Sequence, residues 1–99
     1  MMADLRQLAR GRECMVRSPV CTYDTETTVL AHVRMGGISG MGYKAPDVLG
    51  AYACHACHTL CDAGHYRGVE LSRDERDLLL LNGMARTLSI LVKEGRLKW

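Results

Sequence analysis

The chain has 99 residues, five cysteines and a formal charge of +2. A domain of this size buries too little surface for its core alone to give a comfortable stability margin, so a further staple is expected. The small net charge permits a polyanionic partner without requiring one.

The apolar segments are too short to target or anchor the chain. The first residues carry Asp4 and lack the apolar stretch of a signal peptide. Even the leucine run 78–81 is flanked by Asp77 and Asn82, so no segment approaches the length that spans a bilayer. We therefore expect a cytoplasmic protein without a membrane partner, in which the cysteines bind a metal rather than form disulfides.

The first third predicts a short helix followed by a small sheet. Apolar residues within 4–12 have helical spacing, with Asp4 as a cap and Gly11 as the stop. Residues 14–21 and 27–33 look like a hairpin or a pair of short strands, because the second segment is rich in β-branched residues.

The middle of the chain predicts a loop and then a helix. Four glycines fall within residues 36–46, a composition typical of an exposed loop near a ligand. Asp47 can cap a helix that runs toward Gly64, with Cys54-x2-Cys57 on this helix or at its start.

The last third predicts a long amphipathic helix. Ser72 and Glu75 fit a capping box, and apolar residues then recur at steps of three and four up to Gly95, a typical terminator. The pair Asn82-Gly83 is expected to bend or weaken this helix. No repeat or linker divides the chain, so residues 1–99 are expected to form one domain.

Cys54 and Cys57 have the spacing of a metal knuckle, since two thiolates three residues apart at a turn can reach one tetrahedral ion. Cys14 and Cys21 supply the other two thiolates of a closed structural zinc site, which we favour over buried apolar cysteines. Cys61 could replace Cys14 as a ligand, but a small core residue is the favoured role.

Two histidines flank these parts. His32 lies in the apolar, strand-like run 29–33. His58 directly follows Cys57, so if Cys57 binds zinc, the His58 side chain points away from that zinc site from a backbone that the metal holds rigid. A lone strand histidine is more often a core or surface residue. Here, however, a strand histidine, a glycine-rich loop and a helix with Cys-x-x-Cys-His follow in the order of a metal-dependent nuclease site.

At this point the sequence resembles a known family. Leu30-Ala31-His32-Val33-Arg34 and the later Cys54-His55-Ala56-Cys57-His58 resemble the HNH nuclease motif in its zinc-containing form. Residues 3–6, 9–14, 29–34, 53–58 and 83–87 further resemble the YbcO-like family of prophage proteins, regarded as nucleases. The resemblance implies an α+β fold, with a zinc-stapled ββα-metal core plus the C-terminal helix, that cleaves DNA.

The resemblance also implies residue roles. His32 matches the first histidine of the motif, the general base for water, and His58 matches the last, a ligand of the catalytic divalent cation, which we expect to be magnesium. The middle asparagine has no counterpart, and Asp47 is the nearest substitute, either orienting His32 or touching the ion. Ala31 stands where many members have another ligand, so Asp62 or His65 is expected to complete the ion site.

Basic residues near the proposed site favour a polyanion as a group. The five expected to hold phosphates are Arg10, Arg12, Arg17, Arg34 and Lys44. Arg86, within the C-terminal helix, either reaches the site or pairs with an acid such as Asp47. Two alternatives remain open. One is a non-catalytic zinc-ribbon-like module that binds nucleic acid, and the other is a redox or metal-handling protein, for which the expected βαβ context is missing.

Overall fold

The computed structural model describes residues 4–33 and 46–97. In chain order these residues form α1 (Leu5–Leu8), the 3-10 helix η1 (Thr25–Thr27), β1 (Val29–His32), β2 (Gly50–Ala53), α2 (His55–Ala63), β3 (His65–Tyr66), β4 (Val69–Glu70) and α3 (Arg73–Lys93). The predicted small α+β fold with a long C-terminal helix is confirmed. Within these two ranges, no helix is long and apolar enough to cross a membrane.

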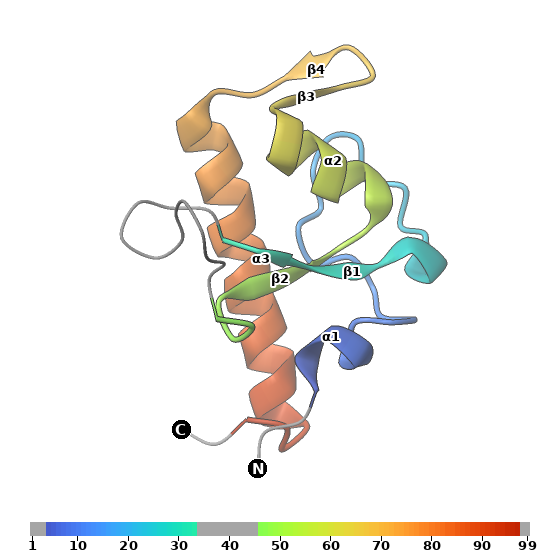
Figure 1. Cartoon of the computed structure of the whole chain (residues 1–99), viewed down its shortest axis with the longest axis vertical. Helices are drawn as coiled ribbons and strands as arrows, with labels where there is room; N and C mark the ends of the chain where they lie inside the picture. The colour runs from blue at the N-terminus through green and yellow to red at the C-terminus, as the bar shows by residue number, and fades with distance from the viewer. Residues whose placement is uncertain (1–3, 34–45, 98–99) are drawn as a thin grey trace.

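Strands β1 and β2 form an antiparallel pair that separates two small cores. Ala31 lies opposite Ala51, and Leu30 lies opposite Tyr52. Because side chains alternate along a strand, these two pairs face opposite sides of the sheet. Ala31 and Ala51 pack with the buried residues of α2, whereas Leu30 and Tyr52 pack with α1. Figure 1 accordingly shows α2 above the β1–β2 pair and α1 below it.

The strand that pairs with β1 is not the predicted one. Residues 14–21 form no strand, because this segment turns sharply, with Arg17 at φ 55° and Pro19 within it. The partner is Gly50–Ala53, where the sequence predicted a helix capped by Asp47. All four residues of β2 are buried. Three of them, Gly50, Ala51 and Ala53, are small, so β1 and α3 pack closely against β2, and this tertiary packing decides the strand conformation.

Helix α2 therefore starts later than predicted, at His55, while its predicted end is confirmed. Its N-cap is Cys54, which makes no side-chain capping bond, and its C-cap is Gly64 at φ 87°. A left-handed cap of this kind favours glycine. At the other end of the chain, α1 is only one turn long, capped by Asp4 as predicted but ending at Leu8 rather than near Arg12.

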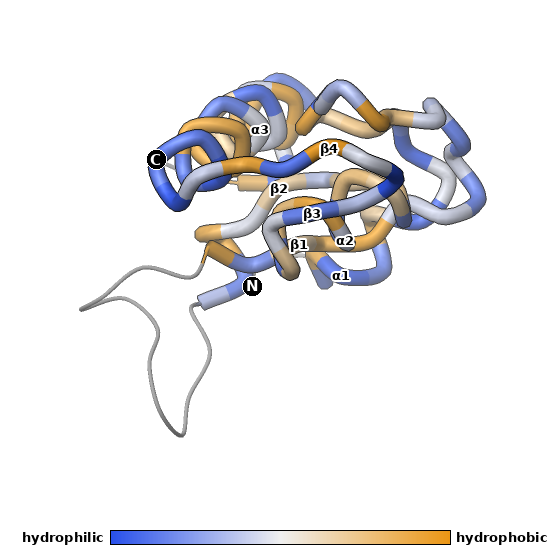
Figure 2. Tube along the Cα trace, turned by 90° about the horizontal axis from the view of Figure 1, so that it is seen from above, coloured by the Kyte–Doolittle hydropathy of each residue, from blue (hydrophilic) through white to orange (hydrophobic). Residues whose placement is uncertain are grey.

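Helix α3 has the predicted capping box of Ser72 and Glu75, and Gly95 follows it at φ 73°. It runs unbroken through Asn82-Gly83, contrary to the expected weakness there. A Cβ on Gly83 would lie 3.0 Å from Val16 Cγ2 and 3.1 Å from Ala51 Cβ. This glycine therefore serves close packing of α3 on β2. Viewed from above in Figure 2, α3 lies at the edge of the molecule, with the other elements on one side of it.

Thr87 joins α3 to β2 at Tyr52, whose carbonyl accepts from the Met15 backbone N–H at 2.7 Å. Its buried hydroxyl accepts a hydrogen bond from the Tyr52 backbone N–H at 3.0 Å and donates to the Gly83 carbonyl at 2.8 Å. Since an unpaired buried N–H is costly, the threonine closes the sheet edge that α3 covers.

Candidate functional site

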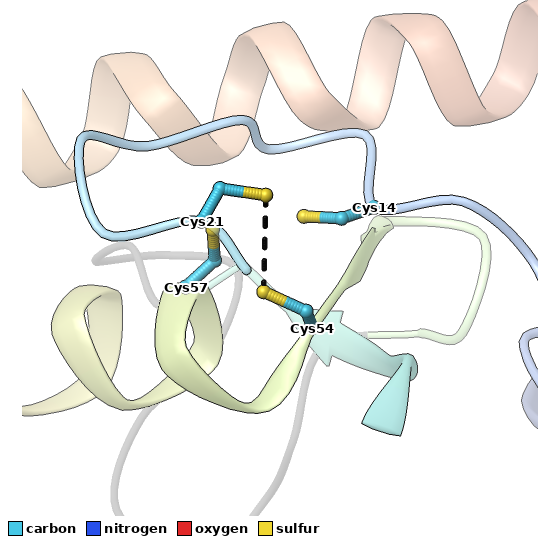
Figure 3. Close-up of side chains that lie close together, drawn as sticks. All are labelled: Cys14, Cys21, Cys54 and Cys57. Carbon is cyan, nitrogen blue, oxygen red and sulfur yellow. Dashed lines mark hydrogen bonds between the residues drawn. The ribbon is translucent and has the colours of Figure 1, made fainter. Parts of the chain in front are cut away.

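Four cysteines from two distant segments meet beside α2. Cys14 and Cys21 come from the irregular segment before β1, Cys54 follows β2 as the N-cap of α2, and Cys57 lies in the first turn of α2 (Figure 3). Their Sγ atoms all lie within 4.8 Å of one another, and those of Cys21 and Cys54 are 3.9 Å apart. The prediction that these four thiols come together is confirmed.

This arrangement fits a tetrahedral ion. A zinc ion with Zn–S bonds of about 2.3 Å places its sulfur ligands about 3.8 Å apart, close to the observed spacing. Ser18 supports the cluster, since its hydroxyl lies 3.0 Å from Cys57 Sγ and its backbone N–H donates to the same sulfur at 3.4 Å. Four protein sulfurs leave no open coordination position, so the site suits a structural rather than a catalytic ion.

Hydrogen bonds and burial set the pKa values of the clustered thiols apart from one another. A hydrogen bond from Cys57 lowers the pKa of Cys14 to about 4, while the pKa of Cys57 is raised by the same contact. Burial raises the pKa of Cys21 to about 11. A thiolate held beside thiols is a site where a cation can replace the protons, as metal binding requires.

Cys61 lies outside this group. It is 5% exposed and packs in the same core as Cys14 and Cys57. The favoured sequence interpretation, a small core residue, agrees with this placement.

His32 and Asp47 form a second polar centre, at the other face of the sheet. His32 Nε2 lies 2.7 Å from Asp47 Oδ1, and the histidine side chain is 16% exposed. The hydrogen bond with His32 lowers the pKa of Asp47, and Arg6 lowers it further. An ionised carboxylate only accepts hydrogen bonds, so Nε2 carries the proton and Nδ1 is the nitrogen left to act as a base.

Arg6 completes this centre and was not predicted from the sequence. Its Nε donates to the same Asp47 Oδ1 at 3.2 Å. The arginine comes from α1, 41 residues away from Asp47 in the chain. In the sequence, only the capping residue Asp4 pointed to α1, the helix that carries Arg6, and a cap does not show what the helix contacts.

The predicted catalytic residues divide between the two faces. His32 shares its face with Leu30 and contacts the α1 side through Asp47, whereas His58 is carried by α2, which packs on the Ala31 face. Asp62, near the end of α2, and His65, in β3, are exposed. Across residues 4–33 and 46–97, the four cysteines are the one group of three or more potential ligands. His58, Asp62 and His65 form no such group there.

The structure shows protein partners for two of the basic residues that were expected near the site. Arg86 Nη1 donates to the Met15 carbonyl at 2.7 Å, rather than reaching Asp47 or the cysteine site. Arg12 forms a double hydrogen bond with Glu94, at 2.5 and 2.7 Å, which raises the pKa of the arginine. Both side chains thus hold the fold together. Arg34 and Lys44 lie outside the described residues.

Comparison with known proteins finds the same family by its family model and by individual relatives. A family model described as "Putative nuclease YbcO" matches residues 3–96. The protein named "Putative nuclease YbcO" from Escherichia coli (strain K12) is 48% identical over 99 residues, covering 98% of this chain and 99% of that protein. "Putative nuclease ybcO" of Enterobacteria phage 82 matches with the same identity and coverage.

A solved structure shares the fold as well. It is titled "Structure of a putative bacteriophage protein from Escherichia coli str. K-12 substr. MG1655" and matches with a TM-score of 0.73 and 40% identity, covering 93% of this chain and 100% of that one. The chain therefore belongs to the YbcO family, whose members carry a nuclease name.

Proposed function

We propose that the protein hydrolyses phosphodiester bonds in DNA, with His32 as the general base and Asp47 as the residue that orients it. The 2.7 Å contact between His32 Nε2 and Asp47 Oδ1 carries the proposal. The succession of β1, β2 and α2 is the order of a ββα-metal core, which supports placing the chain among HNH-like nucleases.

In this proposal His32 Nδ1 takes a proton from the water that attacks phosphorus. The imidazolium that forms then lies against the ionised Asp47, which stabilises the new charge. Arg6 keeps the carboxylate in place by donating to the same oxygen. Asp47 thus does the orienting expected of the missing asparagine.

A closed site of Cys14, Cys21, Cys54 and Cys57 would hold zinc as a structural ion. For a catalytic cation the described residues do not fit, because His58, Asp62 and His65 form no cluster of ligands there. A metal requirement for cleavage therefore stays a prediction, which plasmid nicking with and without a chelator tests. His58 as a ligand of magnesium stays a prediction.

A non-catalytic zinc module that binds nucleic acid is the second candidate. The observation in its favour is that the four cysteines, the one group of potential metal ligands among the described residues, would fill all four coordination positions of a zinc ion and leave none for catalysis. Such a module would bind DNA through basic residues and would not cut it.

Nicking of supercoiled plasmid separates the two candidates. The parent should nick in the presence of magnesium, manganese or nickel, and a chelator too weak to remove thiolate-bound zinc should stop it. His32→Ala should lose about a hundred- to ten-thousand-fold in rate, the usual contribution of a positioned base. His55→Ala is the matched control, because His55 is an exposed histidine on α2 away from Asp47. The binding module predicts no metal-dependent nicking by any of these proteins.

A further inference from the structure

Tyr52 on β2 is 1% exposed and carries a hydroxyl without a partner. Its backbone N–H donates to Thr87 and its carbonyl accepts from Met15, so both of its backbone groups are paired. The hydroxyl, in contrast, is the one buried side-chain polar atom of residues 4–33 and 46–97 that makes no hydrogen bond. An unpaired buried hydroxyl is costly, and phenylalanine would fill the same space without that cost. The hydroxyl therefore needs a partner that the described fold does not supply.

A small recess lies beside this residue. Its volume is about 230 Å³, and its lining consists of Arg12, Glu13, Met15, Tyr52, Ile90 and Glu94. This volume is below the roughly 300–1,000 Å³ of pockets for drug-sized ligands, so the recess suits a single small ring system. Met15 and Ile90 contribute apolar side chains to it, whereas Arg12 and Glu94 contribute charged hydrogen-bonding groups.

The Arg12–Glu94 ion pair lies close to the Tyr52 side chain. The guanidinium carbon of Arg12 is 6.0 Å from the centre of the Tyr52 ring. Burial raises the pKa of Tyr52, and the nearby charges of Arg12, Glu94 and Arg96 act on it in both directions, so the hydroxyl keeps its proton at neutral pH and is available to donate. The side chains of Arg12 and Glu94 are 26% and 35% exposed. They are therefore the part of the lining that can shift to uncover the hydroxyl.

We propose that the recess binds a nucleobase, whose polar edge meets the Tyr52 hydroxyl and the Glu94 carboxylate. Proteins that take up a single base hold it between aromatic or apolar side chains and form hydrogen bonds to its edge. A hydroxyl both donates and accepts, and a carboxylate accepts from ring N–H or amino groups, so the two match the mixed edge of a base. A phosphate fits less well, because the lining carries Glu13 and Glu94 against the single cation Arg12.

The strand register favours an unpaired base of DNA as the source of this nucleobase, a step that rests on the proposed nuclease function. Tyr52 pairs with Leu30, and His32 follows two residues later on the same strand and the same face. Two residues span about 7 Å of a strand, and DNA advances about 3.4 Å per nucleotide along one strand. A base in the recess and a phosphodiester at His32 are therefore about two nucleotides apart. Because base pairing occupies the edge that the recess would bind, only an unpaired base can enter.

Binding of labelled duplexes to the full chain tests the recess, with a weak chelator present to prevent cleavage. Four duplexes each carry a different unpaired base, and a fifth is fully paired. The parent should bind at least one of the four about tenfold or more tighter than the paired duplex, because an unpaired base enters a pocket at little unstacking cost. Tyr52→Phe should lose about two- to tenfold of that preference, the contribution of one neutral hydrogen bond. Tyr23→Phe, at a site that is 68% exposed and outside the recess, is the matched control and should keep it. An equal preference in the parent and Tyr52→Phe overturns the proposal.

Free deoxynucleosides separate the two sources of a base. They should bind more weakly than an unpaired base in DNA, since they lack the phosphates that add affinity, and Tyr52→Phe should weaken them by the same factor. Deoxynucleoside binding that Tyr52→Phe weakens, together with equal binding of all five duplexes, would overturn the DNA source and assign the recess to free nucleosides.

Thermal melting tests the premise that the hydroxyl lacks a partner in the fold. Tyr52→Phe should melt at or above the temperature of the parent, because the change removes an unpaired buried group. A lower melting temperature would show that the fold itself pairs the hydroxyl and would overturn the proposal. The result is separable from that of the nuclease proposal. Plasmid nicking by a parent that binds all five duplexes and deoxynucleosides without a response to Tyr52→Phe would overturn the recess alone, whereas preferred binding of an unpaired base without nicking would support the recess and contradict the nuclease.

Discussion

Replacing one ligand of the cysteine cluster should unfold the domain. Cys57 is fully buried, contacts Ser18, and lies within 4.8 Å of three other sulfurs. Serine is not among the usual ligands of zinc, so Cys57→Ser removes one of four bonds to the ion.

The magnitude follows from the size of the domain. Structural zinc contributes about 10–16 kcal/mol in small zinc domains, and the whole net stability of a domain is about 5–15 kcal/mol. Loss of the ion therefore removes a stabilisation about as large as the whole free energy of unfolding of the domain. Cys61→Ser makes the same change of atom in the same core but outside the cluster. It should cost only about 1–3 kcal/mol for a buried hydroxyl.

Metal analysis and thermal melting test this contrast. The parent and Cys61→Ser should each carry one zinc per chain and melt cooperatively, whereas Cys57→Ser should carry less zinc and show no cooperative melt. A chelator strong enough to strip the ion should unfold the parent as well. The reasoning is refuted by a zinc-free parent whose melting does not respond to chelator, or by a Cys57→Ser protein that melts as the parent does.

Three further predictions concern the sheet edge and the polar centre. Thr87→Val should cost about 1–3 kcal/mol in urea unfolding, because the buried Tyr52 N–H loses its acceptor, whereas Thr87→Ser should keep that bond. Arg6→Ala should slow cleavage less than Asp47→Asn does, since the arginine acts only through the carboxylate; equal losses would contradict that order. The pKa of Asp47 is lowered, mainly by His32, so its contribution to stability is present above the usual aspartate pKa and is lost as pH falls through the lowered value. In urea titrations below about pH 4, Asp47→Asn should lose less stability than the parent.

Features that rest on local chemistry were predictable from the sequence. The capping box of Ser72 and Glu75 and the glycine after α3 are satisfied within a few residues of the chain, so tertiary packing cannot easily override them. The cysteine cluster was predictable for another reason. Thiolates have few roles in a small chain of this kind, and Cys54-x2-Cys57 fixes half of a tetrahedron.

Features that depend on distant neighbours were not predictable. Residues 50–53 contain two alanines and a glycine, with no periodicity that distinguishes strand from helix, and packing between β1 and α3 decides their conformation. The same applies to Gly83, interpreted as a weak point and found at the closest contact of α3 with β2. Arg6 could not be placed because its partner Asp47 is 41 residues away.

The orientation of His32 by Asp47 was one of two roles considered for this aspartate, and the sequence alone did not decide between them. The 2.7 Å contact between His32 Nε2 and Asp47 Oδ1 favours the orienting role. His32 also lies on the face of the sheet opposite the one on which α2, the helix that carries His58, packs. Such a division between faces depends on the strand register, which a sequence pattern specifies only when both partner strands are correctly identified.

The most direct test of the central claim is a double-mutant cycle on the rate of plasmid cleavage, with His32→Ala, Asp47→Asn and the double variant. If Asp47 acts by orienting His32, the double variant should be no slower than His32→Ala alone, because the aspartate has nothing left to orient. Independent losses that multiply in the double variant would contradict the account, and so would a folded His32→Ala protein that cleaves as fast as the parent.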